Sequence, residues 1–299
     1  MASRRASMAH PDDEDTSMNV KAFVRIRPLN QREIAEKQSI TWEFNDTTML
    51  ENTANGQRAY NTDRCFGPTT NNTQIYDIVG RSIVIRAMEG YNGTILSYGE
   101  AGSGKSFTLK GVDTDPGIIT RSVTDVFQYV EQHPNYDITI KVSYIEIYTE
   151  EIHDLLGVQD TASKNLNIVN EDINKGAVIG GLVEEIVRTP KDLHNAIKRA
   201  EAVLSSSGGS TYKKSFSHTI FRLTIEVKDQ LDKASGSSYL NSDFEHSQRV
   251  SYLTLVDVAS SSSETQRGPQ TDVNKVSTNS VSADLYQVNL HTVTISILA

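Results

Sequence analysis

Hydrophobic and polar residues alternate in several stretches of the chain, which is typical of β-strands with one covered face. Residues 138–148, ITIKVSYIEIY, have the clearest pattern, and residues 20–27 alternate in the same way until Pro28 ends the run. We expect strands at residues 20–27, 138–148, 219–227 and 250–256, with shorter strands within residues 39–66. Residues 288–298, VNLHTVTISIL, are rich in β-branched side chains and also favour a strand.

Other stretches place hydrophobic residues three or four positions apart, as in a helix that packs one face on a core. This spacing predicts helices at residues 73–88, 118–130 and 190–204, and a short helical segment at residues 150–156. Strands that alternate with helices predict the α/β class, with a mostly parallel central sheet covered by helices. Residues 1–18 are polar and charged without periodicity, so we expect a disordered extension before one domain at residues 19–299.

A glycine-rich stretch between a predicted strand and a helix-compatible run carries the strongest chemical signal. Residues 99–106, GEAGSGKS, fit the pattern G-x-x-x-x-G-K-[ST] of a phosphate-binding loop. Glycines let the backbone wrap closely around a polyphosphate, so that the backbone N–H groups point at the negatively charged phosphate oxygens. Lys105 can reach the β- and γ-phosphates, and the Ser106 hydroxyl can ligate Mg²⁺. The predicted nucleoside triphosphate site consists of Gly99, Gly102, Ser103, Gly104, Lys105 and Ser106.

Composition narrows the choice of partners. The chain has 29 Lys and Arg against 38 Asp and Glu, and its net charge of −9 argues against bulk attraction to nucleic acid or an anionic membrane. No apolar run approaches the length of a membrane-spanning helix. Cys65 is the single cysteine, which excludes an intramolecular disulfide and fits a reducing compartment. We therefore expect neither nucleic acid nor a membrane as a partner.

Several further stretches, together with the loop, resemble the kinesin motor domain family. Residues 25–28, RIRP, are similar to the family's R-x-R-P strand, and residues 90–99 to its G-Y-N-G-T-I…Y-G stretch. Residues 215–221, SFSHTIF, resemble the first switch, S-S-R-S-H-x-I-F, and residues 255–259, LVDVA, resemble the second, L-V-D-L-A-G-S-E. The resemblance covers roughly residues 19–259 and is strongest to the centromere-associated (CENP-E-like) branch. It implies a P-loop NTPase fold of kinesin type.

The resemblance also implies roles in binding ATP with Mg²⁺. Asp257 would hold the hydration shell of the metal together with Ser106, and Ser217 in the first switch would share the catalytic role with Asp257. The adenine base and ribose would be contacted by Arg25, Arg27, Pro28 and Phe107. The residues alone leave two alternatives open. Phe107 could be an aromatic side chain of the core, and Asp257 could cap the end of a strand. The implied partner is the microtubule (tubulin), and the implied location is cytoplasmic, on the cytoskeleton.

The chain departs from the family pattern where the γ-phosphate is sensed and cleaved. Phe216 stands where the first switch has an arginine, and Ser262 where the second has a glutamate, so the ion pair that the family forms there is missing. Ser260 replaces a glycine whose N–H faces the γ-phosphate in the family. Glu100 and Ala101 replace Gln-Thr in the phosphate loop. These changes predict strongly reduced ATP turnover.

The last residues of the chain also depart from the family. The sequence ends at Ala299, and we expect it to lack the strand and helices that complete the family's sheet and much of its microtubule-binding face. Three functions stay open: a working microtubule motor ATPase, a nucleotide-binding pseudo-motor that binds without cycling, or a fragment without independent function. The switch residues favour the second and third, and microtubule binding is expected to be weak. The direction of movement, the cargo and the oligomeric state do not follow from the sequence.

Overall fold

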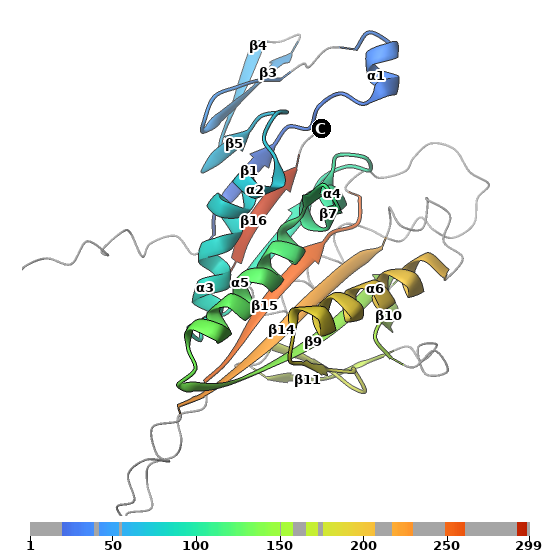
Figure 1. Ribbon diagram of the computed structural model, residues 1–299. Helices are drawn as coiled ribbons and strands as arrows, with labels where there is room; N and C mark the ends of the chain where they lie inside the picture. Colours follow the sequence, from blue (N-terminus) through green and yellow to red (C-terminus); the bar gives the residue numbers. More distant parts are fainter. Residues whose placement is uncertain are drawn as a thin grey trace, which may run out of the picture.

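The computed structural model describes residues 20–38, 42–53, 56–149, 151–157, 166–172, 176–206, 217–229, 249–260 and 292–297. The expected N-terminal extension, residues 1–18, lies outside these ranges. The described elements form a central β-sheet with long helices packed along it (Figure 1). The α/β class expected from the sequence is therefore confirmed.

The central sheet has the strand order β10-β9-β14-β15-β6-β16-β1-β5, with β13 paired to β9. The five strands from β15 to β5 run parallel to their neighbours, whereas β10, β9, β14 and β15 form antiparallel pairs. The sheet is thus mixed, and the mostly parallel arrangement expected from the sequence holds for one half of it. The strands are β1 (Ala22–Arg25), β5 (Arg64–Phe66), β6 (Gly93–Tyr98), β9 (Tyr136–Tyr148), β10 (Glu151–Asp154), β13 (Glu185–Val187), β14 (His218–Asp229), β15 (Arg249–Asp257) and β16 (Thr292–Ile297).

The strand β16 corrects the expectation that the sheet lacks its completing strand. β16 lies between β6 and β1 and pairs with both in parallel, so that Thr294 is opposite Leu96 on one side and Ala22 on the other. Its β-branched residues favour the extended conformation, and this preference for a strand was visible in the sequence. Since β16 joins the two neighbouring strands, the parallel half of the sheet is continuous.

A second correction concerns β10, which replaces the helical segment expected at residues 150–156. Thr149 has a φ of 50°, in the left-handed region, and the chain reverses there into a hairpin with β9. Ile152 then pairs with Ile147, and the Asp154 carboxylate accepts a backbone hydrogen bond from Leu156 at 2.9 Å. A helix of barely two turns is only marginally stable, so the hydrogen bonds that this segment makes with the long strand β9 favour a strand instead.

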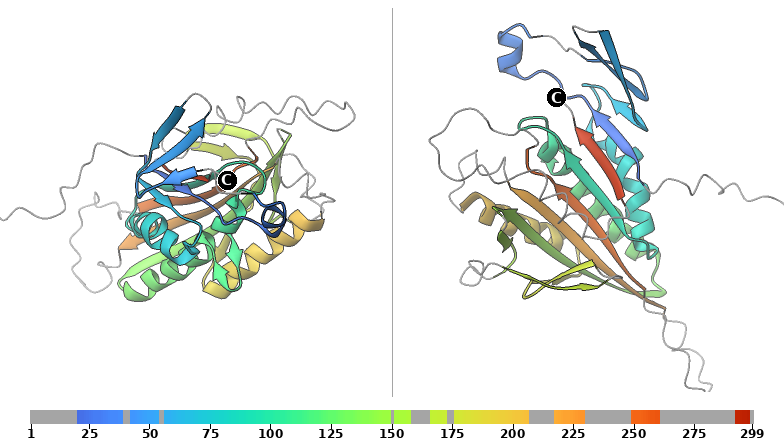
Figure 2. Two further views of the ribbon diagram at one scale, coloured as in Figure 1. Left: turned by 90° about the horizontal axis from the view of Figure 1, so that it is seen from above. Right: turned by 180° about the vertical axis from the view of Figure 1, so that it is seen from behind.

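Helices α3 (Arg81–Met88), α5 (Ile118–Gln132) and α6 (Pro190–Ser206) cover one face of the sheet, and the hairpin of β11 (Ile168–Asp172) and β12 (Gly176–Ile179) lies on the other (Figure 2). Tyr144 and Phe221 lie in the main core between the helices and the sheet. Their rings pack edge to face, with centroids 5.6 Å apart. The helix expected at residues 73–88 contains one π-helical turn, η1. The helices are α1 (Gln31–Ala35), α2 (Asn72–Ile75), η1 (Tyr76–Gly80), α3 (Arg81–Met88), α4 (Lys105–Leu109), α5 (Ile118–Gln132) and α6 (Pro190–Ser206). The small sheets are β2 (Trp42–Phe44) with β3 (Thr48–Thr53) and β4 (Gly56–Asn61), β7 (Gly111–Val112) with β8 (Asp115–Pro116), and β11 (Ile168–Asp172) with β12 (Gly176–Ile179).

Three chain segments meet at one edge of the sheet. The parallel strands β6 and β15 end side by side, with Ser97 opposite Asp257. The neighbouring strand β14 runs antiparallel and begins at the same edge, so that Thr219 lies opposite Asp257 on its other side. The glycine-rich loop that follows β6 is therefore placed next to the end of β15 and the start of β14.

Candidate functional site

The glycine-rich loop joins the end of β6 to the first turn of α4. Gly102 and Gly104 have φ angles of 81° and 100°, a left-handed conformation that favours glycine. A Cβ added at either position would meet nothing within 4 Å, so backbone conformation and not crowding requires these glycines. Ser103 between them is buried, and its hydroxyl is one of two buried side-chain polar atoms without a hydrogen-bond partner in the described residues.

Lys105 places its ammonium group against the inside of this loop. Its Nζ donates hydrogen bonds to the backbone oxygens of Gly99 at 2.8 Å and Glu100 at 2.7 Å. Burial lowers the pKa of Lys105, while the negative charges of Asp257 and Glu100 act in the opposite direction. The loop therefore has a buried cation that is held by neutral carbonyl groups, an arrangement suited to a negatively charged ligand.

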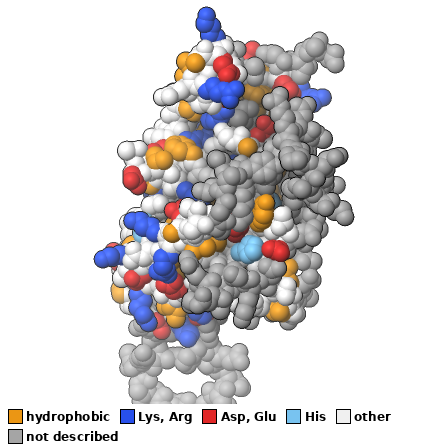
Figure 3. Space-filling view, turned by 90° about the vertical axis from the view of Figure 1, so that its right-hand side faces the viewer, with side chains coloured by type: hydrophobic (Ala, Val, Ile, Leu, Met, Phe, Trp, Pro, Cys, Tyr) orange, Lys and Arg blue, Asp and Glu red, His pale blue; other side chains and the backbone are white. Residues whose placement is uncertain are grey.

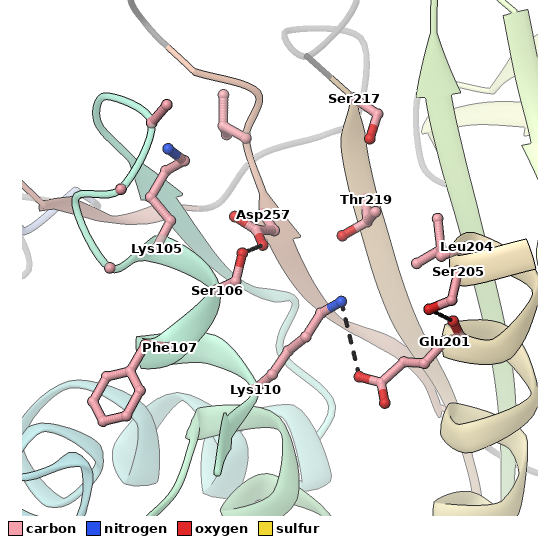
Figure 4. A pocket seen from close by; sticks show the side chains of 14 residues that line it. Lys105, Ser106, Phe107, Lys110, Glu201, Leu204, Ser205, Ser217, Thr219 and Asp257 are labelled. Carbon is pink, nitrogen blue, oxygen red and sulfur yellow. Dashed lines mark hydrogen bonds and ion pairs between the residues drawn. The ribbon is translucent and has the colours of Figure 1, made fainter. Parts of the chain in front are cut away.

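Ser106 and Asp257 form a hydrogen-bonded pair at the centre of the site (Figure 4). The Ser106 hydroxyl donates to Asp257 Oδ2 at 2.6 Å, and the Ser97 hydroxyl donates to Oδ1 at 3.2 Å. Hydroxyl and carboxylate oxygens are ligands that Mg²⁺ takes, and Mg²⁺ in nucleotide sites commonly completes its shell with phosphate oxygens and water. The described residues contain no group of three His, Cys, Asp or Glu side chains that could hold a metal ion. The residues present therefore fit a metal that arrives with a phosphate ligand.

A cavity of about 530 Å³ opens beside this pair, within the size range of small-molecule sites. Thr219 of β14 and Ser217, which directly precedes β14, line it opposite Ser106 and Phe107 of α4 (Figure 4). The structure thus brings together most of the residues that the sequence assigned to the phosphates and the metal, and with them Phe107, which was assigned to the base. Those in contact with the cavity are Gly102, Gly104, Lys105, Ser106, Phe107, Ser217 and Asp257.

Arg25, expected at the base and ribose edge, is buried behind Phe107. Its guanidinium donates to Asn72 Oδ1 at 2.7 Å and to Thr108 Oγ1 at 2.8 Å, and it lies 5.1 Å from the centre of the Phe107 ring. Burial lowers the pKa of Arg25, partly opposed by the charge of Asp115. These contacts tie β1 to α2 and α4. The Phe107 ring itself is 40% exposed, so it is accessible to a planar ligand and is not a core aromatic.

Arg27 and Pro28, the other two residues expected near the base, lie outside the lining of the cavity. The Arg27 guanidinium makes two contacts with the Glu33 carboxylate of α1, at 2.7 and 2.6 Å. This hydrogen bonding raises the pKa of Arg27 and lowers that of Glu33 to about 2. Pro28 is exposed. Their contact with a base stays a prediction.

Lys110 and Glu201 face the cavity and were missed by the sequence reasoning. Lys110 follows Ser106 by one helical turn, and its Nζ lies 3.8 Å from Glu201 Oε1 of α6 (Figure 4). Burial acts to lower the pKa of Lys110, but the Tyr144 hydroxyl and the carboxylates of Glu201 and Asp257 outweigh it and the pKa is raised. The spacing of four residues from Ser106 was the available signal, because i and i+4 share one helix face.

Two hydrogen bonds attach the segment that follows β15, residues 258–260, to its surroundings. The backbone N–H of Ala259 donates to His218 Nδ1 at 3.1 Å. Ser260 accepts a hydrogen bond on its hydroxyl from the backbone N–H of Ala101 in the phosphate loop, at 2.9 Å. Phe216 and Ser262, which the sequence comparison with the family also singled out, lie outside the described residues.

The loop with its buried lysine, the serine–aspartate pair and the adjoining cavity have the arrangement of a P-loop. Residues 25–287 match the family profile described as the kinesin motor domain. The chain therefore belongs to the kinesin motor domain family. No described helix is long and apolar enough to cross a membrane.

Individual relatives agree with the family. The Kinesin-like protein KIN-7K, chloroplastic, of Arabidopsis thaliana is 40% identical over 248 residues, which are 82% of this chain and 24% of that protein. Centromere-associated protein E of Homo sapiens is 34% identical over 83% of this chain and 9% of its own length. A solved structure of a fast kinesin superposes with a TM-score of 0.78 at 25% identity, covering 93% of this chain and 84% of that one. The chain spans about a quarter of the length of the first curated relatives that it matches.

Proposed function

We propose that this chain is the nucleotide-binding motor domain of a kinesin-related protein and that it binds ATP with Mg²⁺ in the cavity beside α4. The observation that carries the proposal is the grouping of Lys105, Ser106 and Asp257 around a loop whose glycines are left-handed. This grouping supplies a cation for the phosphates and oxygen ligands for the metal. Kinesin membership supports adenine as the base and the cytoskeleton as the site of action.

Each residue has a separate task in this proposal. Lys105 would exchange the two carbonyl oxygens that it now contacts for phosphate oxygens, which carry full negative charge. Ser106 and Asp257 would hold Mg²⁺, directly and through water, and a bound Mg²⁺ neutralises charge on the phosphates. Phe107, half exposed at the rim, would stack on the base. Ser217, directly before β14, would face the phosphates.

The test is a thermal melt with and without millimolar Mg-ATP. A ligand at 100 times its Kd adds about 2.7 kcal/mol to the free energy of unfolding, so the midpoint should rise. Lys105→Ala should remove the shift, whereas the matched control Lys198→Ala, at an exposed position of α6, should keep it. A cooperative melt that does not move with Mg-ATP would remove the nucleotide-site proposal, and a melt without cooperativity would instead favour a fragment that has no independent function.

We also propose that turnover is strongly reduced, so that the chain acts as a nucleotide-binding pseudo-motor. The support is the sequence of the switches, where Phe216 and Ser262 take the places of the family's ion pair. A further support is Ser260, whose hydroxyl is engaged with the phosphate loop. The competing function is a working motor ATPase, and steady-state phosphate release separates the two.

Microtubule binding, which family membership brings, is proposed to be weak. The track is acidic and this chain has a net charge of −9, so attachment requires a local basic surface. On the face shown in Figure 3, the coloured Lys and Arg side chains are interspersed with Asp and Glu. Residues 261–291, where the family's second switch continues, lie outside the described residues. The proposal therefore rests on the overall charge.

A further inference from the structure

We propose that Arg25 and Asn72 act as positioning residues, which hold the Phe107 ring in place for a nucleotide base without contacting the base themselves. The inference rests on the proposed nucleotide site and specifies what supports its rim. Phe107 lines the cavity beside α4, and its ring is 40% exposed. Arg25 and Asn72 are buried and lie outside the lining of that cavity. Their effect on a base is therefore proposed to pass through Phe107.

The helix that carries Phe107 needs support from other elements. α4 has only five residues, Lys105–Leu109, and a helix of this length is marginally stable by its own hydrogen bonds. Since the ring is partly exposed, packing does not surround it on the cavity side. The direction of the Phe107 side chain thus depends on the contacts behind α4.

Asn72, the first residue of α2, holds the main chain at Phe107. Asn72 is fully buried, and its Nδ2 donates to the Phe107 oxygen at 3.1 Å and to the Asp115 oxygen at 3.0 Å. The backbone N–H of Asn72 donates to Asp115 Oδ2, also at 3.0 Å. The side-chain amide therefore uses both of its N–H groups on backbone oxygens, and it fixes α4 relative to the start of α2.

Arg25 supports the Phe107 ring from behind. The guanidinium carbon lies 5.1 Å from the centre of the ring, within the range of a cation–π contact. The same guanidinium donates to Asn72 Oδ1 at 2.7 Å, to Thr108 Oγ1 at 2.8 Å and to the Thr70 oxygen at 3.0 Å. Three directed bonds fix the plane of the cation, and the cation in turn favours one position of the ring.

Two conservative changes disturb this support in different ways. Arg25→Lys keeps the positive charge but lacks the planar fork that reaches Asn72 and Thr108 together. Asn72→Asp keeps the size of the side chain and an acceptor for Arg25, but it has no N–H group to hold the Phe107 oxygen. The competing alternative is direct contact of Arg25 with the base or ribose, and it predicts that Arg25 acts whether or not the ring is present.

The experiment measures the affinity of Mg-ADP by titration calorimetry, and that of Mg-pyrophosphate, which has no base, by competition with Mg-ADP. Phe107→Ala removes the stacking contact and should weaken Mg-ADP about tenfold. Arg25→Lys and Asn72→Asp should each weaken Mg-ADP about threefold to fivefold and leave Mg-pyrophosphate within about twofold. Combined with Phe107→Ala, neither change should weaken Mg-ADP further. Ser122→Ala, which removes a buried hydroxyl hydrogen bond of 2.8 Å in α5, should leave both affinities unchanged.

The contrary results are distinct from one another. Losses of Mg-ADP affinity that are equally large without the Phe107 ring would show that Arg25 contacts the nucleotide directly, and would overturn the positioning role. Parallel losses for Mg-ADP and Mg-pyrophosphate, or no loss in either single variant, would overturn it too. Absence of Mg-ADP binding to the unmodified protein would instead overturn the proposed function. Thermal melts show which variants are folded, and Arg25→Lys and Asn72→Asp each remain a test if the other is not.

Discussion

His218 Nδ1 accepts a hydrogen bond from the backbone N–H of Ala259 at 3.1 Å, which joins the start of β14 to the segment after β15. The acceptor role requires that Nδ1 carries no proton. His218 is buried, and this desolvation lowers its pKa to about 4. The contact between the two switch positions therefore depends on a neutral imidazole.

This relationship predicts a loss of stability in mild acid. The pKa of a histidine is about 6.5 in the unfolded chain, and that of His218 is about 4 in the folded chain. Between pH 4 and pH 6.5 the unfolded chain therefore binds a proton that the folded chain does not. The contribution of His218 is thus fully present above about pH 6.5 and is lost as the pH falls toward 4, by roughly 3 kcal/mol in total. Denaturant unfolding at a series of pH values measures the slope.

The matched variant for this prediction is His218→Asn, whose amide oxygen can accept the Ala259 hydrogen bond and does not titrate between pH 4 and 7. Carboxylates that titrate in the same range contribute equally to both proteins. The difference between the two stability curves should therefore grow below pH 6.5. Curves that stay parallel would show that His218 is not the group responsible.

A second prediction concerns ATP hydrolysis. It follows from the proposal that Phe216, Ser262 and Ser260 take the places of the family's ion pair and phosphate-sensing glycine. Losing one positioned electrostatic group typically costs on the order of 10²–10³ in kcat, so we expect phosphate release near background in the unmodified protein. Phe216→Arg or Ser262→Glu alone should recover little, since each adds a charge without its partner. The triple variant with Ser260→Gly should recover more than the single changes together.

Phosphate release is measured at saturating Mg-ATP, for the unmodified protein, each single variant and the triple variant. The triple variant carrying Lys105→Ala as well is the control for contaminating ATPases. Turnover in the unmodified protein at the level of active kinesins would mean that other residues have taken over the roles of the switches, and that the pseudo-motor proposal is wrong.

A third prediction is that the chain fails to sediment with microtubules at submicromolar concentration in moderate salt. Net charges of the same sign on chain and track repel over about 10 Å at 0.1 M ionic strength. Co-sedimentation is measured at several salt concentrations, with a salt-independent pellet taken as aggregation. Submicromolar binding that weakens as salt is added would reveal a basic attachment surface and contradict the prediction.

The grouping of residues at the cavity could be predicted closely from the sequence because most of them belong to one local motif. Glycines, a lysine and a hydroxyl spaced within eight residues are typical of a phosphate-binding loop. The structure places Lys105 and Ser106 of this loop next to Asp257, which is over 150 residues away in the sequence. That meeting follows from parallel pairing of β6 with β15. Lys110 and Glu201 were missed because their approach depends on how α6 packs beside α4, which no spacing within either segment reveals.

The errors in the fold arose where long-range pairing decides the conformation. Ile152 lies in a segment with helical spacing, yet its pairing partner Ile147 places it in a strand. The segment that contains Thr294 was recognised as strand-like, but its position between β1 and β6 could not be read from its own residues. Arg25 was assigned to the ligand by resemblance, whereas its bonds to Asn72 and Thr108 also give it a structural use.

The last prediction concerns the ion pair of Lys110 and Glu201 at the cavity. Lys110→Met keeps most of the side-chain volume and removes the positive charge, so Glu201 and Asp257 leave the cavity more negative. A charge change of this kind in a partly solvated site is worth about 1 kcal/mol, so nucleotide affinity should fall about threefold to fivefold. Because screening weakens such effects, the loss should shrink as salt is raised.

A double-mutant cycle separates this charge effect from simple damage to the cavity. Glu201→Gln alone should strengthen nucleotide binding slightly, and Lys110→Met with Glu201→Gln should return the affinity close to that of the unmodified protein. The affinities are measured by titration calorimetry with Mg-ADP at two salt concentrations, and thermal melts confirm that each variant is folded. If the double variant binds as weakly as Lys110→Met, then Lys110 acts through its packing, and the balance of charge in the cavity does not govern the affinity.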